Sequence, residues 1–285
     1  MNTHASITLS EATDQAQELL KGSGYIYLRN AFSKEEITEA RNLIHKHSET
    51  STEQVTHFHG KHQDKIHLQR RVWNLIEKGA IFAKMVQHPQ IIAIVKAFLG
   101  SEVCLGSIAA NRILPGGPGQ EPHIDYPYWD LYKQASFPLG INASFPLNCQ
   151  ATIMLDPFTE TSGATGIIPY SQTRCVYPDD ETYFYKHCER TLGEAGDVVL
   201  FNGLCWHAAM PNKSKSIDRT AILIQYLPKF VKPMEDQKNG VSKQVLDKAS
   251  PLLRQLLGFD YPYPKQLDKA TGGNEEGKYA QNNTD

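Results

Sequence analysis

The chain has 285 residues, of which 40% are hydrophobic, and its formal net charge is −2 at pH 7. This length and apolar content are enough for one sizeable core, so we expect one domain over residues 1–270 and a polar, disordered tail at residues 271–285. The near-neutral charge argues against nucleic-acid and anionic-membrane partners, which usually require a basic surface, and favours a small-molecule partner.

The five cysteines predict a reducing compartment, because they are scattered, odd in number and without a Cys-X-X-Cys pair. The N-terminal residues lack a basic segment followed by an apolar core, and no apolar run reaches the length of a membrane span. We therefore expect a cytoplasmic protein, either a monomer or a homodimer.

The first fifty residues predict a strand between two helices. Residues 9–21 have apolar side chains at helical spacing, with Ser10 as the capping residue. Residues 25–29 read as a strand, and the capping box that starts at Ser33 predicts a second helix.

A polar segment at residues 49–69 contains four histidines: His57, His59, His62 and His67. Their neighbours are Gln, Lys, Thr and Asp, which favours a mobile loop near the mouth of a site over a second metal site. The next segment, residues 73–98, predicts helix with a break at Pro89. Asn74 at its start is either a substrate contact or a helix cap.

Several short strands are expected in the middle of the chain. Residues 103–114 predict a strand that ends in a Pro-Gly-Gly-Pro-Gly loop, which cannot continue a β-ladder. Residues 149–156 and 163–169 predict two more strands around a polar turn. Together with the helices at the flanks, these strands indicate a mainly β fold with flanking α-helices.

The glycine-rich loop leads to His123 and Asp125, which are two residues apart. On an extended strand such residues point to the same face, so an imidazole nitrogen and a carboxylate oxygen converge. This is two-thirds of the 2-His-1-carboxylate site that holds non-haem Fe(II). An isolated triplet of this kind is more often a turn cap beside a solvated carboxylate.

A second segment, around His207, favours the metal site over the turn cap. A β-rich run at residues 198–201 leads to His207, a polar turn covers residues 211–218, and a second β-rich run begins at Arg219. The pattern predicts a hairpin with a histidine near the end of one arm and an arginine near the start of the other. Further on, residues 241–257 predict an amphipathic helix that forms a lid or a dimer surface.

His123, Asp125, His207 and Arg219, with the Gly-Asp-Val-Val-Leu-Phe sequence before the second histidine, resemble the phytanoyl-CoA dioxygenase superfamily of Fe(II)/2-oxoglutarate oxygenases. In that family about eighty residues separate the His-X-Asp pair from a distal histidine, and about a dozen separate this histidine from an arginine. Here 82 residues separate Asp125 from His207, and 12 separate His207 from Arg219. The likeness covers about residues 24–228.

The resemblance implies a double-stranded β-helix, the jelly-roll or cupin-like core, with Fe(II), 2-oxoglutarate and O₂ as its cofactor and cosubstrates. It makes His123, Asp125 and His207 the iron ligands and the catalytic centre. Arg219 would bind the far carboxylate of 2-oxoglutarate, because a buried carboxylate requires a fixed cation. On its own, Arg219 would read as a surface arginine after a polar turn.

The resemblance also assigns secondary roles. Thr152 and Gln120 occupy positions that often donate hydrogen bonds to the carboxylates of 2-oxoglutarate, and Asn111 and Gln150 are alternatives. Any of these side chains would also satisfy a neighbouring strand. Aromatic residues beside the ligands either line a substrate pocket or pack in the core, and the candidates are Tyr126, Trp129 and Trp206.

The implied reaction is the oxidative decarboxylation of 2-oxoglutarate to succinate and CO₂, coupled to hydroxylation of an unactivated C–H bond of a small molecule in secondary metabolism. Asp125 favours hydroxylation or desaturation, because related halogenases carry Gly or Ala at that position. A catalytically silent jelly-roll protein that binds a metabolite is the alternative. Oxidation of a protein or nucleic acid would predict a basic or open groove, for which the near-neutral charge gives no support.

Overall fold

The computed structural model describes residues 7–50, 63–125 and 145–260. Tyr126 and Trp129 lie outside this part of the chain, as do His57, His59, His62 and the expected tail at residues 271–285. His67 lies exposed in the 3₁₀ helix η1 (Gln63–Leu68).

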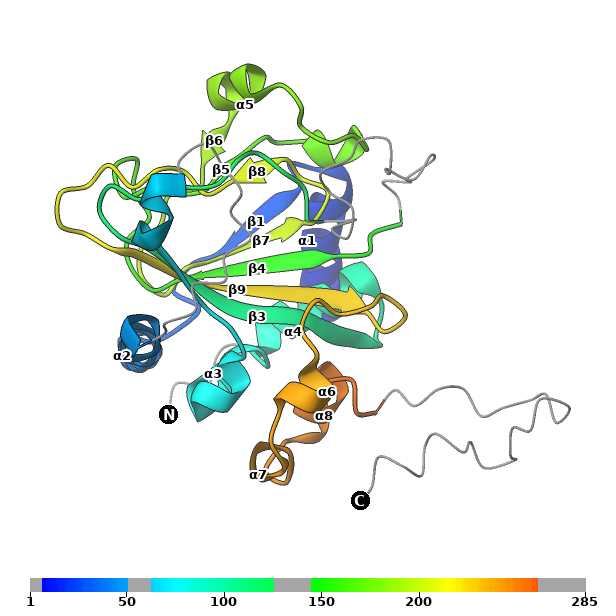
Figure 1. Cartoon of the computed structure of the whole chain (residues 1–285). Helices are drawn as coiled ribbons and strands as arrows, with labels where there is room; N and C mark the ends of the chain where they lie inside the picture. Colours follow the sequence, from blue (N-terminus) through cyan, green and yellow to red (C-terminus); the bar gives the residue numbers. More distant parts are fainter. Residues whose placement is uncertain (1–6, 51–62, 126–144, 261–285) are drawn as a thin grey trace, which may run out of the picture.

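The described strands form a larger and a smaller antiparallel sheet (Figure 1). The larger, or major, sheet has the order β1 (Tyr25–Leu28), β7 (Val198–Asn202), β4 (Cys149–Met154), β9 (Arg219–Pro228), β3 (Val103–Ile113) and β2 (Gln69–Val72). The smaller, or minor, sheet has the order β6 (Glu189–Arg190), β5 (Gly166–Ile167) and β8 (His207–Ala208). These two sheets with their flanking helices confirm the predicted jelly-roll fold.

The alternation of side chains along β9 shows how the major sheet is buried on both faces. Ile222, Ile224 and Tyr226 point outward into the main core, which they share with the helices. The intervening Ala221 and Leu223 point inward, toward the minor sheet. Period-two alternation with one face against helices and one against a second sheet leaves the inner face free to carry a site.

Helices cover the outer face of the major sheet, on the side away from the minor sheet (Figure 1). Before β3 the chain forms α1 (Leu9–Lys21), α2 (Lys34–Thr50), the 3₁₀ turn η2 (Leu75–Lys78), α3 (Ala80–Met85) and α4 (Pro89–Leu99). After β9 it forms α6 (Gln237–Gly240), α7 (Lys243–Leu246) and α8 (Pro251–Leu256). The 3₁₀ turn η4 (Ser171–Thr173) follows β5, and α5 (Glu181–His187) lies on the side of the minor sheet, where Phe184 packs with Trp206 and Ala208 (Figure 1). No helix in the ranges described is long and apolar enough to cross a bilayer.

The helix starts follow their capping residues. The predicted capping box of α2 is confirmed, because the Glu36 N–H donates to Ser33 Oγ (3.3 Å) and the Ser33 N–H donates to the Glu36 carboxylate (2.8 Å). The predicted cap of α1 was wrong by two residues. Thr8, with Glu11 as its reciprocal partner, caps α1, and Ser10 lies in its first turn.

Three other predictions need correction. β7 and the strand that begins at Arg219 are not a hairpin, because β4 lies between them and pairs with both. The helix expected at residues 73–98 is divided into η2, α3 and α4. The new start at Pro89 confirms the predicted break, whereas the extended backbone at Gly79 was not predicted. The helix expected at residues 241–257 is two short helices, each capped by its own serine.

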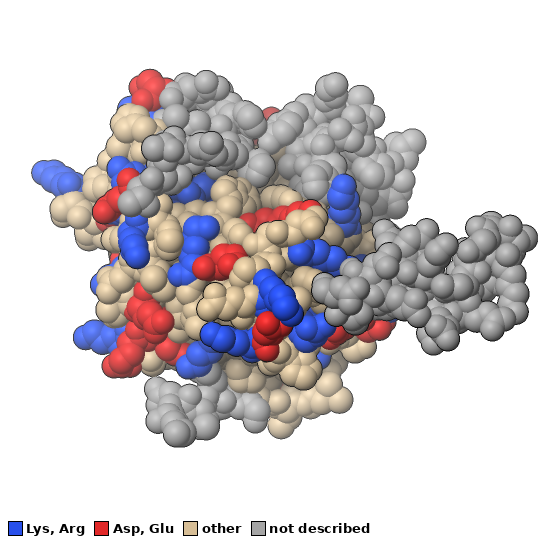
Figure 2. All heavy atoms as spheres, turned by 60° about the horizontal axis from the view of Figure 1, so that its bottom comes forward, with Lys and Arg blue, Asp and Glu red and all other residues tan. Residues whose placement is uncertain are grey.

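Charges are mixed on the face that carries the C-terminal helices. Figure 2 shows lysine and arginine interspersed with aspartate and glutamate there, without a continuous field of one sign.

Candidate metal centre and ligand pocket

His123, Asp125 and His207 meet at the edge of the minor sheet. His123 and His207 exchange backbone hydrogen bonds of 2.9 and 3.0 Å, and the Asp125 N–H donates to Gly203 O at 2.8 Å. Asp125 Oδ1 lies 3.8 Å from His123 Nε2, and Asp125 Oδ2 lies 3.4 Å from His207 Nε2. Among the residues described, this is the one cluster of three such donors, whose atoms all lie within 4.8 Å of one another.

Backbone carbonyls orient both imidazoles. His123 Nδ1 donates to Glu121 O at 2.7 Å, and His207 Nδ1 donates to Cys205 O at 3.0 Å. Because a carbonyl only accepts, the proton of each neutral ring lies on Nδ1, and the Nε2 lone pairs face Asp125.

Burial, with the neighbouring His207, lowers the pKa of His123 to about 4, so this imidazole is neutral at pH 7. Two neutral imidazole nitrogens and one carboxylate oxygen are the donor set that suits a divalent transition metal, and they leave such an ion with a net charge of +1. The side chains present therefore fit the metal that the sequence predicts.

The three side chains open into a cavity of about 540 Å³ between the two sheets, a size within the range of about 300–1,000 Å³ that is usual for small-molecule sites. Three rows of inward-facing residues cross the major sheet beneath it. The rows are Arg71-Asn111-Ala221-Met154, Ala109-Leu223-Thr152-Val199 and Ser107-Gln225-Gln150-Phe201. Predicted residues that line the cavity are Gln120, Thr152, Arg219, Asn111 and Gln150.

Arg219 lies in this cavity as a buried cation, 1% exposed. Its Nε and Nη2 atoms have no hydrogen-bond partner among the described residues, and its guanidinium lies over the Phe158 ring at 4.9 Å. Burial, with the positive charges of Arg71 and Arg190, lowers the pKa of Arg219 to about 9, so it stays protonated at neutral pH. A buried cation without a counter-ion is costly, and it is a ready site for an anion.

Arg71 is a second cavity arginine that the sequence did not reveal. It lies on β2, opposite Asn111, and its Nε also lacks a hydrogen-bond partner in the part of the chain that the structure describes. Burial lowers its pKa to about 10, and the Asp125 carboxylate acts in the opposite direction. Arg70 and Arg71 are adjacent in the sequence, so only the register of β2 decides which of them faces inward.

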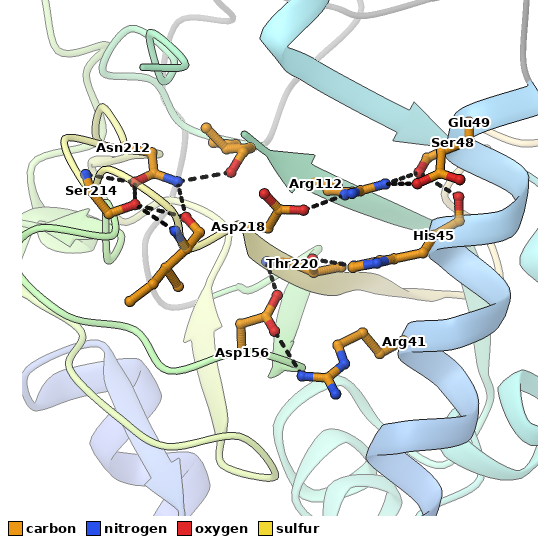
Figure 3. Close-up of polar contacts among 12 residues, drawn as sticks. Arg41, His45, Ser48, Glu49, Arg112, Asp156, Asn212, Ser214, Asp218 and Thr220 are labelled. Atoms are coloured by element: carbon orange, nitrogen blue, oxygen red, sulfur yellow. Dashed lines mark hydrogen bonds and ion pairs between the residues drawn. The ribbon is translucent and has the colours of Figure 1, made fainter. Parts of the chain in front are cut away.

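A polar network on the outer side of β9 anchors the backbone on both sides of Arg219 (Figure 3). Asp156 accepts the Thr220 N–H at 2.9 Å and binds Arg41 of α2 at 3.2 Å. Asp218 binds Arg112 of β3 at 2.7 Å. Because residues 218 and 220 are both held, the start of β9 is fixed, and with it the direction in which Arg219 enters the cavity.

The structure places two predicted residues outside the cavity. The Asn74 side chain donates to Gly240 O at 2.7 Å, and Trp73 lines the cavity in its place. The Trp206 ring packs in a separate apolar cluster, and its Nε1 donates to Val176 O at 2.8 Å. Alternation explains Trp206: adjacent strand residues point to opposite faces, so His207 and Trp206 cannot share a site. Thr165, which falls in the strand predicted at residues 163–169, also lines the cavity, although the sequence gave no sign of this role.

Comparison with known proteins agrees with this geometry. Residues 20–221, which include all three triad residues and Arg219, match the sequence model of the phytanoyl-CoA dioxygenase (PhyH) family. Rv1501 of Mycobacterium tuberculosis is 26% identical over 260 residues, which cover 90% of each chain. Dioxygenase af480 of Aspergillus fumigatus is 23% identical over 254 residues, 87% of this chain and 77% of the relative.

A third relative, dioxygenase ALT11 of Alternaria alternata, is 24% identical over 279 residues, 91% of this chain and 86% of the relative. The family match spans most of the chain, and it contains the metal-binding triad and the buried cation of the cavity. The chain therefore belongs to the phytanoyl-CoA dioxygenase (PhyH) family, and it is an oxygenase.

Proposed function

We propose that the protein is an Fe(II)- and 2-oxoglutarate-dependent dioxygenase that hydroxylates an unactivated C–H bond of a small molecule and releases succinate and CO₂. The observation that carries this proposal is the pair of cavity arginines beside the His-Asp-His triad. Among the described residues, Nε and Nη2 of Arg219 and Nε of Arg71 have no hydrogen-bond partner. A dicarboxylate with a keto acid at one end meets the needs of both arginines and of the metal centre.

The two arginines would have different roles. Arg71 is close enough to the triad for the Asp125 charge to act on it, so it is suited to the carboxylate at the metal end of 2-oxoglutarate. Arg219 lies where β9 begins and is suited to the far carboxylate, because its fork of donors matches two oxygens and its charge persists at neutral pH.

Polar neighbours would complete the cosubstrate site. Gln120 Nε2 lies 3.4 Å from His123 Nε2, which brings its amide to the open side of the metal centre. Thr152 and Thr165 line the cavity and offer hydroxyl donors from the major sheet and from the segment before β5.

Iron would supply the activation of O₂ when bound. The chain itself would hold the two carboxylates, keep both imidazoles oriented through their Nδ1 hydrogen bonds, and exclude water from the space between the sheets. A cavity of about 540 Å³ has room for 2-oxoglutarate and part of a small substrate, and relatives named as dioxygenases support an oxidation.

The direct test is an anaerobic titration of the Fe(II)-loaded protein with 2-oxoglutarate, followed by visible absorption. A metal-to-ligand charge-transfer band is expected, because a keto acid that chelates Fe(II) produces one. His207→Ala should abolish iron retention and the band together. A folded, iron-loaded wild-type protein that gives no band would instead support a jelly-roll protein that binds a metabolite without turnover.

A further inference from the structure

We infer that the part of the cavity not used by 2-oxoglutarate binds a substrate that carries a protonated nitrogen. This inference rests on the proposed function, because it assigns the two arginines to the cosubstrate. The remaining walls of the cavity would then recognise the substrate.

The charges of the cavity are divided between its walls. Both cationic side chains, Arg71 and Arg219, come from the major sheet. The carboxylates apart from Asp125 come from the opposite side, where Glu121 lies in the segment before His123 and Asp179 precedes α5. Glu181, at the first turn of α5, also lines this wall.

Among the described residues, neither Glu121 nor Asp179 forms an ion pair with the two arginines. Asp125 is the cavity carboxylate whose charge acts on Arg71, and Asp156, outside the cavity, acts on Arg219. Glu121 is half-buried and forms no ion pair with the residues that the structure describes. Its charge is therefore available to a ligand.

The summed charge of the cavity remains negative after a metal and 2-oxoglutarate bind. Among the described residues, two arginines and four carboxylates line the cavity, and together they have a formal charge of −2. A divalent metal and the dianion of 2-oxoglutarate cancel each other, so the loaded cavity keeps this sign. An anionic substrate would be repelled there, whereas a cation would be attracted.

The floor of this part of the cavity is polar but uncharged. Ser107, Gln225 and Gln150 form one row across three neighbouring strands. Gln225 is 1% exposed and lines the cavity, and its Oε1 has no hydrogen-bond partner within the described ranges. A buried amide with unused hydrogen-bonding capacity is costly unless a ligand pairs with it.

Apolar side chains lie beside the polar row. Leu223, Phe201 and Met234 line the same cavity, and they offer surface for a carbon skeleton. The combination of apolar wall, amide floor and carboxylate wall fits an amphipathic amine, and it does not fit a purely apolar substrate.

Three matched probes test this inference: 2-phenylethylamine, 2-phenylethanol and 3-phenylpropanoate, which present a cation, a neutral hydroxyl and an anion on similar skeletons. The protein is loaded with Mn(II), and the paramagnetic broadening of each probe's proton NMR signals is measured with and without 2-oxoglutarate. Broadening reports binding close to the metal. The His207→Ala variant, which should not hold the metal, provides the background.

With 2-oxoglutarate present, the amine should be broadened more than the alcohol, and the anion least. Glu121→Gln should reduce the broadening of the amine by about two- to fivefold, the range expected for loss of one partly exposed charge pair, and leave the alcohol unchanged. Asp179→Asn should act in the same direction. Glu39→Gln, the same change on an exposed residue of α2, should affect no probe.

Equal broadening of amine and alcohol, or an amine signal insensitive to both cavity substitutions, would overturn the inference. The same experiment tests the proposed function separately, through the anionic probe. Without 2-oxoglutarate the anion should bind at the arginines, and 2-oxoglutarate should displace it. If that displacement fails, the cosubstrate assignment is wrong, whatever the amine does.

Discussion

Arg219 shows what a single buried charge costs the free protein. The guanidinium is 1% exposed and two of its nitrogens lack partners, although a stacked Phe158 ring offsets part of this deficit. Natural proteins keep such a buried cation where a bound ligand supplies the missing acceptors. The stability lost in the free protein is then recovered on binding.

Replacing Arg219 by Met should therefore separate stability from function. The variant should unfold at the same or a higher urea concentration, with a gain of up to about 1–3 kcal/mol, because an unpaired buried cation is replaced by an apolar chain of similar length. It should retain the metal but lose 2-oxoglutarate binding in the anaerobic titration. A large loss of stability would show that Arg219 is a structural residue.

At the scale of elements, the outer network links α2, β3 and the start of β9 (Figure 3). Asp156 is central to it, because one carboxylate oxygen holds the Thr220 N–H and the other holds Arg41. The network residues lie behind the sheet, outside the described cavity lining, and they connect to it through β9, which carries Arg219, and β3, which carries Asn111.

Asp156→Ala should weaken 2-oxoglutarate binding several-fold without changing metal retention. The buried Thr220 N–H would lose its acceptor, at a cost of about 1–3 kcal/mol in the free energy of unfolding, and the first residues of β9 would loosen. Both quantities come from urea unfolding and from the titration. Equal loss of metal and 2-oxoglutarate would indicate general unfolding, and Glu39→Gln provides the surface control.

A second element-scale contact is formed by Glu235, whose carboxylate accepts the Ile108 N–H at 2.7 Å and the Asn74 N–H at 2.9 Å. The pairing register of β3 shifts between Leu105 and Ser107, directly before Ile108. The Glu235 carboxylate therefore supports the backbone beside Ser107 of the cavity floor and beside Trp73 of the cavity wall. Burial raises the pKa of Glu235 despite these hydrogen bonds.

The raised pKa of Glu235 determines whether its contribution to stability rises or falls with pH. The protonated form of Glu235 is favoured in the folded protein, so its contribution to stability is complete below its ordinary pKa of 4.5 and declines as pH rises through the higher folded value. The melting temperature of the wild type relative to Glu235→Gln should therefore fall as pH rises through this window. A difference that grows with pH would contradict the burial effect.

At the scale of the whole molecule, the two sheets contribute different halves of the site. The minor sheet with its paired segment brings the metal ligands, and the major sheet brings both arginines. A ligand that bridges the halves should stabilise the entire fold, because it binds the folded state alone.

With metal present, 2-oxoglutarate at a hundred times its dissociation constant should add about 2.7 kcal/mol to the free energy of unfolding. The matched compound 2-oxobutyrate keeps the keto acid but lacks the far carboxylate, so at equal concentration it should add far less. Thermal unfolding with each compound measures the difference. Equal shifts would remove Arg219 from the proposed site.

The sequence alone was sufficient to predict the parts of the site that depend on local order. His123 and Asp125 converge because they are two residues apart on extended chain, and the Gly-rich loop before them frees that segment to pair with β8. Alternation along the strands and the capping box at Ser33 are equally local, so β1, β3, β4 and α2 were predicted close to their actual bounds.

The tertiary structure decided everything that depends on which strands are neighbours. β4 enters between β7 and β9, a long-range pairing that no turn sequence encodes, and so the expected hairpin does not exist. The register of β2 against β3 turns Arg71 inward, and the pleat turns Trp206 away from His207. A one-residue change of register moves every side chain of a strand to the other face, so cavity residues contributed by separate strands emerge only from the assembled sheets.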